Sequence, residues 1–140
     1  MFSYRHAFHA GNHADVLKHT VLIAILRHLL QKDTALTVFD THAGAGLYRL
    51  DGDYAETSGE AAGGILQLLA SKDKPPAAPV RKTPEAGQPA AVALAPIIQD
   101  YLDLVASFNN KGSHKVYPGS PFIIQRLLGE RDKLKLFEIH

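Results

Sequence analysis

The sequence contains no cysteine, which excludes disulfide bonds and metal sites built on thiolates. It also lacks any run of about 18 apolar residues that could span a membrane, and its first residues do not form a signal peptide. We therefore expect a cytoplasmic protein without a membrane span. The net charge of +1 is small, so a phosphate-binding surface would have to come from local clustering of basic residues.

The length and the hydrophobic content fit one globular domain, with 140 residues of which 46% are hydrophobic. Residues 1–13 show no regular period and are interpreted as an ordered, irregular arm. A helix should begin after Asn12, which can cap it. Leu17, Val21, Ile25 and Leu29 lie four residues apart on this helix, and Leu22 and Leu26 widen the stripe, so the pattern predicts one broad buried face.

Two short apolar segments, residues 36–39 and 134–139, are predicted to be strands, the first of them a buried parallel strand. Helices are expected over residues 65–69, 97–108 and 121–128, with Pro96 in the first turn of the second. Residues 71–92 are rich in proline and alanine, and this composition predicts a mobile surface insertion. The pattern is therefore α/β.

A glycine-rich turn follows the first strand, in the run Asp40-Thr41-His42-Ala43-Gly44-Ala45-Gly46. Glycines at such a turn let a ligand lie against the backbone, although the same pattern also fits a tight turn with no ligand. A dinucleotide fingerprint would place glycine where Arg49 stands, which weakens that reading. Asp40 suits the ammonium group of a ligand such as S-adenosylmethionine. Glu138, near the end of the second strand, suits ribose hydroxyls or is simply an exposed carboxylate.

Four of the eight histidines fall within the first nineteen residues. A metal site is one interpretation, but no His-Glu-x-x-His arrangement is present, and hydrogen-bonding histidines are commoner. We predict no metal site. Ser120 stands before Pro121 at the start of the last helix, where we expect it to act as the helix cap.

Two runs in this sequence resemble a known family. The first is Tyr4-Arg5-His6-Ala7-Phe8-His9-Ala10-Gly11-Asn12-His13-Ala14-Asp15-Val16-Leu17-Lys18-His19, and the second is the loop from Asp40 to Gly46. Residues 56–59, 117–121 and 137–140 continue the resemblance in order. The chain is similar to the bacterial 23S ribosomal RNA adenine-N6 methyltransferase J family, some members of which are also described as involved in catabolism of external DNA.

The resemblance implies the N-terminal part of a class I, Rossmann-like, S-adenosylmethionine-dependent methyltransferase with an inserted helical subdomain. Residues 1–50 would hold the arm, the first helix, the first strand and the cofactor loop. Residues 51–117 would form the inserted subdomain, and residues 118–140 would return to the core. Together with the residue-level reading, it gives a cofactor site of Lys18, His19, Asp40, His42, Gly44, Gly46, Ser120 and Glu138. Tyr4, Arg5 and His6 would contact the substrate RNA.

The family's catalytic Asp-Pro-Pro-Tyr motif is missing from this sequence. We therefore expect a fragment that binds S-adenosylmethionine but has no turnover alone, cut from a monomeric enzyme that methylates 23S ribosomal RNA. The alternatives are a non-catalytic module that binds nucleic acid or cofactor, a protein linked to catabolism of external DNA, and, less well supported, a nicotinamide-dependent oxidoreductase.

Overall fold

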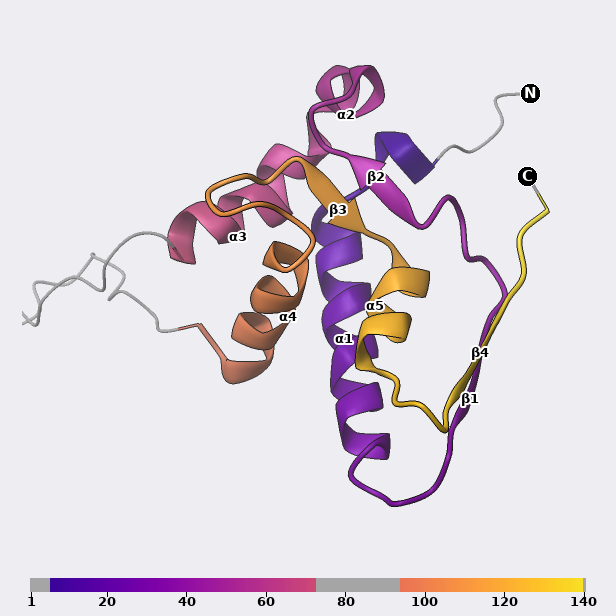
Figure 1. Cartoon of the computed structure of the whole chain (residues 1–140). Helices are drawn as coiled ribbons and strands as arrows, with labels where there is room; N and C mark the ends of the chain where they lie inside the picture. Colours follow the sequence, from indigo (N-terminus) through magenta and orange to yellow (C-terminus); the bar gives the residue numbers. More distant parts are fainter. Residues whose placement is uncertain (1–5, 73–93, 140) are drawn as a thin grey trace, which may run out of the picture.

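The computed structural model describes residues 6–72 and 94–139, which form a mixed α/β arrangement of helices and two small two-stranded sheets, with the β1–β4 sheet at one edge (Figure 1). In chain order the elements are η1 (His6–Phe8), α1 (His13–Leu29), β1 (Thr37–Asp40), β2 (Leu47–Arg49), α2 (Asp53–Ser58), η2 (Glu60–Gly63), α3 (Ile65–Lys72), α4 (Pro96–Ala106), β3 (Val116–Pro118), α5 (Ser120–Leu127) and β4 (Lys133–Leu136). Tyr4, Arg5 and residues 73–92 of the predicted insertion lie outside the described residues.

Strands β1 and β4 pair in parallel, with Thr37 opposite Lys133 and Asp40 opposite Leu136. The two predicted strands are thus confirmed, and so is the parallel direction of the first, although β4 ends three residues earlier than expected. The prediction that β1 is buried was wrong. Its side chains alternate between exposed and half-buried, and Phe39 is 56% exposed, because α5 covers one face of the pair and no described element covers the other.

Helix α1 begins where the sequence predicts, with the side chain of Asn12 accepting a hydrogen bond from the backbone N–H of Asp15 at 2.9 Å. The predicted buried face was wrong in its main row, however. Leu26 is buried and Leu22 half-buried, but the four residues of the row are exposed: Leu17 (67%), Val21 (48%), Ile25 (52%) and Leu29 (40%). The helix instead buries the side that contains His19 and Ile23, because α4 and α5 pack there.

Strands β2 and β3 form an antiparallel pair that the sequence did not predict, in which Tyr48 lies opposite Tyr117. Three-residue strands are too short to show a period of two, so only the two tyrosines could have marked them. Both tyrosine side chains are buried, and the pair delivers the chain to the start of α5.

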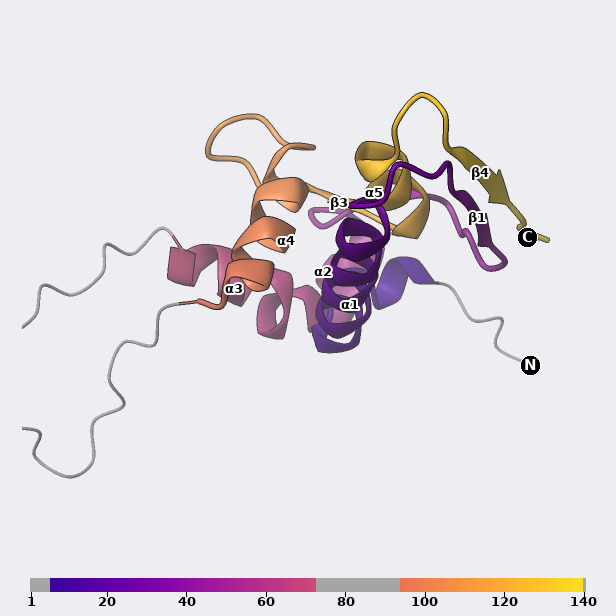
Figure 2. The same cartoon turned by 90° about the horizontal axis from the view of Figure 1, so that it is seen from below.

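Helices α3 and α4 lie on the side of α1 away from β1 and β4 (Figure 2). Helix α4 packs on α1, and the guanidinium of Arg27 donates two hydrogen bonds to the carboxylate of Asp100, at 2.9 and 2.8 Å. Ile23, Ile65 and Leu102 lie at the centre of the core with no exposed surface. Within the described ranges, no helix is both long enough and apolar enough to cross a membrane.

Candidate functional site

The predicted site residues from the two parallel strands meet at the carboxyl ends of those strands. The carboxylate of Glu138 accepts a hydrogen bond from the backbone N–H of Gly44 at 2.6 Å, although the two residues are 94 positions apart. The backbone N–H of Ala43 donates to the carbonyl of Phe137 at 3.2 Å. In Figure 1 the segment after β4 runs beside the loop after β1. In an open parallel sheet, this edge is where ligands bind.

Asp40 ties the glycine loop to the start of α5. One carboxylate oxygen accepts the hydroxyl hydrogen of Ser120 at 2.6 Å, and the other accepts the backbone N–H of His42 at 3.2 Å. The prediction that Ser120 caps α5 was wrong. Gly119 occupies the cap position with no side-chain bond, and Ser120 is the first helical residue, whose hydroxyl turns to Asp40 instead. The strand end and the helix start are thereby joined by a charge-assisted hydrogen bond.

Two glycines of the loop occupy positions that other residues would strain. Gly44 and Gly46 have φ values of 62° and 80°, in the left-handed region. A Cβ on Gly44 would lie 2.5 Å from the hydroxyl of Tyr48, and one on Gly46 would lie 2.7 Å from the ring of Phe122. The loop therefore packs its backbone directly onto side chains, which an ordinary turn does not require.

Asp15 connects the N-terminal arm to α1. Its side chain is only 1% exposed and accepts hydrogen bonds from the backbone N–H of Gly11 at 3.0 Å and from Nε2 of His6 at 2.9 Å. Lys18 forms an ion pair with it at 2.8 Å, while 60% of the Lys18 side chain stays exposed. Burial alone raises the pKa of Asp15, but the bonds from His6 and Lys18 outweigh it and hold the pKa well below its usual range.

His19 is buried beside this cluster, and its Nδ1 lies 2.6 Å from the hydroxyl of Tyr117. Burial lowers the pKa of His19 to about 4, while the negative charges of Asp15 and Asp40 act in the opposite direction. The imidazole is therefore neutral at neutral pH. Tyr117 stands three residues before Ser120, whose hydroxyl bonds to Asp40, so α1 and the strand ends contribute to one region.

Most of the predicted residues are thus linked, and three residues that the sequence reading missed help to hold them. His42 is exposed, with its Nδ1 3.0 Å from the hydroxyl of Thr41. The missed residues are Asp15, Tyr117 and Tyr48, whose ring centroid lies 5.1 Å from that of His6. The only sequence signal for the tyrosines was their place beside the glycine loop and the Pro-Gly turn.

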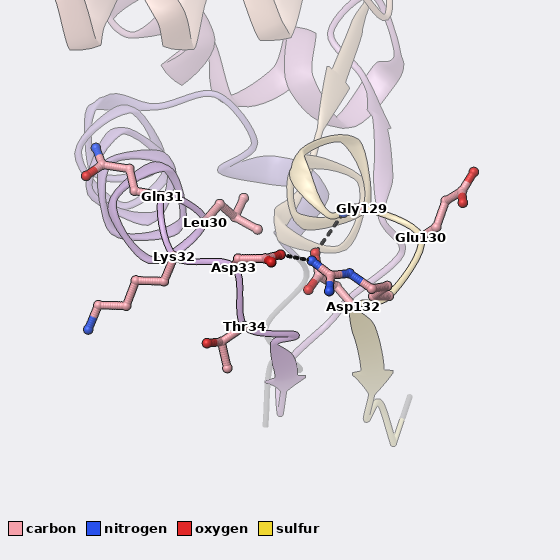
Figure 3. Close-up of a pocket in the computed structure, with 9 residues that line it drawn as sticks. Leu30, Gln31, Lys32, Asp33, Thr34, Gly129, Glu130 and Asp132 are labelled. Carbon is pink, nitrogen blue, oxygen red and sulfur yellow. Dashed lines mark hydrogen bonds and ion pairs between the residues drawn. The ribbon is translucent and has the colours of Figure 1, made fainter.

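A hollow at the other end of the parallel pair does not belong to this site (Figure 3). It is lined by residues 30–34 and 129–132, before β1 and before β4, and an ion pair between Asp33 and Arg131 crosses it. Ligands of open parallel sheets bind at the opposite edge. Across residues 6–72 and 94–139, no group of three or more histidine, aspartate or glutamate side chains is arranged to hold a metal ion.

The site combines two carboxylates with the cation Lys18 and with His19, whose neutral imidazole can donate a hydrogen bond. Glu138 and Asp40 can accept hydrogen bonds from hydroxyl or ammonium groups, while Lys18 can pair with an anionic group. These groups complement a small zwitterionic ligand that also carries hydroxyls. The arrangement can bind and orient such a molecule against the backbone of the loop.

The chain is similar to several known proteins. The family model described as "Ribosomal RNA large subunit methyltransferase D, RlmJ" matches residues 33–79 and 89–140. Ribosomal RNA large subunit methyltransferase J of Escherichia coli (strain K12) is 42% identical over 140 residues, which is 100% of this chain and 43% of the relative. The Haemophilus influenzae protein of the same name is 38% identical over 141 residues, again 100% of this chain and 43% of the relative.

A solved structure is also similar. Protein LPL1258 from Legionella pneumophila aligns with a TM-score of 0.73 and 28% identity, over 94% of this chain and 40% of that one. The chain therefore spans less than half the length of the relatives described here. Because the family model matches well over half of the chain, the chain belongs to the RlmJ family of ribosomal RNA large subunit methyltransferases.

Proposed function

We propose that this chain supplies the cofactor-binding part of an enzyme that transfers a methyl group from S-adenosylmethionine to N6 of an adenine in 23S ribosomal RNA. The observation that carries the proposal is the hydrogen bond from Gly44 to Glu138, at the carboxyl ends of two adjacent parallel strands. Family membership supports methyl transfer, and the names of the relatives support a ribosomal RNA substrate. The proposed architecture is the N-terminal part of a Rossmann-like methyltransferase.

The residues of the site fit S-adenosylmethionine. Glu138 would accept hydrogen bonds from the two ribose hydroxyls, and Asp40 would accept from the ammonium group. The cofactor's carboxylate would pair with Lys18 and accept a hydrogen bond from His19, with His42 and Ser120 completing the site beside Gly44 and Gly46. When bound, the cofactor supplies a methyl group activated by a positively charged sulfur.

The N-terminal arm would contact the RNA. Tyr4 and Arg5 precede the described residues, and His6 packs on the ring of Tyr48 next to the glycine loop. An arm in this position can reach a base brought up to the cofactor, and enzymes that modify a base amino group take the base out of its stack. The sequence holds no Asp-Pro-Pro motif, so we expect this chain alone to bind the cofactor without turning over.

The first test is calorimetric titration of this chain with S-adenosylhomocysteine and with NAD. Binding of the first and not the second is expected, and the reverse result would favour an oxidoreductase. Glu138→Gln should weaken S-adenosylhomocysteine binding about tenfold or more, because a charged acceptor becomes neutral. Glu130→Gln, at an exposed position before β4, is the matched control and should bind like the unmodified chain.

The second test uses the product of the whole gene and unmodified 23S ribosomal RNA. Transfer of a radioactive methyl group to an adenine N6 is expected. Methylation of a protein or a small molecule instead would overturn the substrate assignment. RNA binding with no transfer would favour a non-catalytic module. Turnover by the 140-residue chain alone would contradict the expectation that it binds the cofactor without catalysing transfer.

A further inference from the structure

Three polar side chains from three elements form a continuous row through the interior. The hydroxyl of Tyr101 on α4 lies 3.1 Å from the hydroxyl of Tyr117 on β3, which lies 2.6 Å from Nδ1 of His19 on α1. Tyr101 and Tyr117 have no exposed surface, and His19 is 5% exposed. None of the predicted binding roles uses the two tyrosines, so the row needs an explanation of its own.

The number of available hydrogens determines which group donates and which accepts in each of these two hydrogen bonds. Each tyrosine hydroxyl has one hydrogen to donate, and neither has another hydrogen-bond partner in the described part of the chain. If Nδ1 of His19 donated to Tyr117, one of the two hydroxyl hydrogens would have no acceptor, and leaving a buried donor unpaired is costly. If Tyr101 donates to Tyr117 and Tyr117 donates to Nδ1, every hydroxyl hydrogen is used.

This direction fixes the histidine tautomer. Burial lowers the pKa of His19 to about 4, so the ring carries a single hydrogen at neutral pH. Because Nδ1 accepts, that hydrogen must be on Nε2. No described group forms a hydrogen bond with Nε2, which leaves it as a donor for something that is not part of these residues.

We propose that Tyr117 and Tyr101 are positioning residues that hold His19 as the Nε2–H tautomer, so that this N–H donates to the carboxylate of a bound amino-acid-type ligand. The inference rests on the proposed function for the identity of the ligand, but not for the tautomer. The other tautomer would present a lone pair to an anionic group, which repels it. Two buried hydroxyls thus determine whether the side chain attracts or repels the ligand, without touching it.

The tautomer is tested directly by long-range proton–nitrogen correlation spectra of the chain labelled with 15N-histidine, near pH 7. The His19 signals are assigned by their loss in His19→Gln. We expect Nδ1 to have the shift of an unprotonated acceptor and Nε2 that of an N–H. In Tyr117→Phe, both nitrogens should move toward an average of the two tautomers. An Nδ1–H in the unmodified chain would overturn the proposal, even if Tyr117→Phe did not fold.

The effect on the ligand is tested by titration with S-adenosylhomocysteine. Tyr117→Phe should lower the affinity about tenfold, and Tyr101→Phe about threefold, because it removes only the support of Tyr117. Tyr54→Phe, at a tyrosine that is 46% exposed, should change it less than about twofold. Thermal unfolding of each variant shows whether it is folded at the titration temperature.

The two proposals fail in different ways. If the unmodified chain does not bind S-adenosylhomocysteine, the proposed function fails. The inference about His19 is then tested only by the nitrogen spectra of the unmodified chain and of Tyr117→Phe. If the unmodified chain binds and folded Tyr117→Phe binds equally well, the positioning role is wrong while the proposed function stands.

Discussion

Moderate acid should weaken the fold through His19 before most carboxylates begin to titrate. Burial lowers its pKa to about 4, from an ordinary value of 6.5, against the attraction of Asp15 and Asp40. Between these two values the imidazole is neutral in the folded protein and charged in the unfolded chain. The unfolded state therefore binds the extra proton, and the free energy of unfolding falls as the pH drops below 6.5.

The size of the loss follows from the gap between the two pKa values. At a pH below both pKa values, the free energy of unfolding has fallen by about 3 kcal/mol. Between about pH 7 and about pH 4.5, it falls by about 2 kcal/mol. The lowered pKa of Asp15 acts at lower pH, because its stabilisation is complete above the unfolded value of 3.8 and is lost only as the pH falls through the folded one. The chosen interval therefore reports mainly on His19.

The assay is urea unfolding followed by far-ultraviolet circular dichroism near pH 7 and near pH 4.5. The unmodified chain and the control His28→Gln, at an exposed position of α1, should both lose about 2 kcal/mol. His19→Gln should lose much less, because its amide does not titrate and can still meet the hydroxyl of Tyr117. An equal loss in His19→Gln and in the unmodified chain would refute the reasoning.

Three further substitutions, two of them with a second glycine as control, test the packing of the backbone and of the surface. Gly64→Ala should cost about 3 kcal/mol or more in thermal unfolding, because its Cβ would overlap the backbone that precedes α1, whereas Gly63→Ala has open space around the new methyl group. Gly46→Ala should lose about 1–2 kcal/mol and bind S-adenosylhomocysteine about tenfold more weakly, because its φ of 80° and an aromatic ring of α5 both oppose a side chain. Gly112→Ala, with a φ of 77° but no close neighbour, measures the conformational strain alone and should leave binding unchanged. Arg27→Met should cost less than about 1 kcal/mol, and less still in high salt, because the ion pair it breaks is exposed; a larger loss would show that the pair is coupled to the core.

The parts of the fold that depend on neighbouring residues in sequence can be predicted. Asn12 caps α1 because a side chain three residues before an N–H can reach it, and this geometry is local. Pro96 opens α4 for the same kind of reason. The strand that delivers Asp40 to a glycine turn can also be recognised locally, and with it one half of the site.

Features that depend on packing between elements distant in the sequence cannot be predicted in this way. The apolar row of α1 that includes Leu17 and Ile25 has the right period for burial, but a period does not identify what packs against it, and the described elements lie on the other side. Ser120 has the chemistry of a cap, yet Asp40, 80 positions away, is the better acceptor. Tyr117 gains its role only from α1 and α4.

The hydrogen bond between Gly44 and Glu138 also determines when the site can form during protein synthesis. The two residues are 94 positions apart, so at a synthesis rate of about 5–20 residues per second Gly44 waits roughly 5–20 seconds for its partner to be made. During that interval α1 and β1 can already exist on the ribosome, while the carboxylate that holds the loop does not. Among the described elements, the glycine loop is therefore one of the last to gain its partner, and the candidate site is not assembled before Glu138 has emerged from the ribosome.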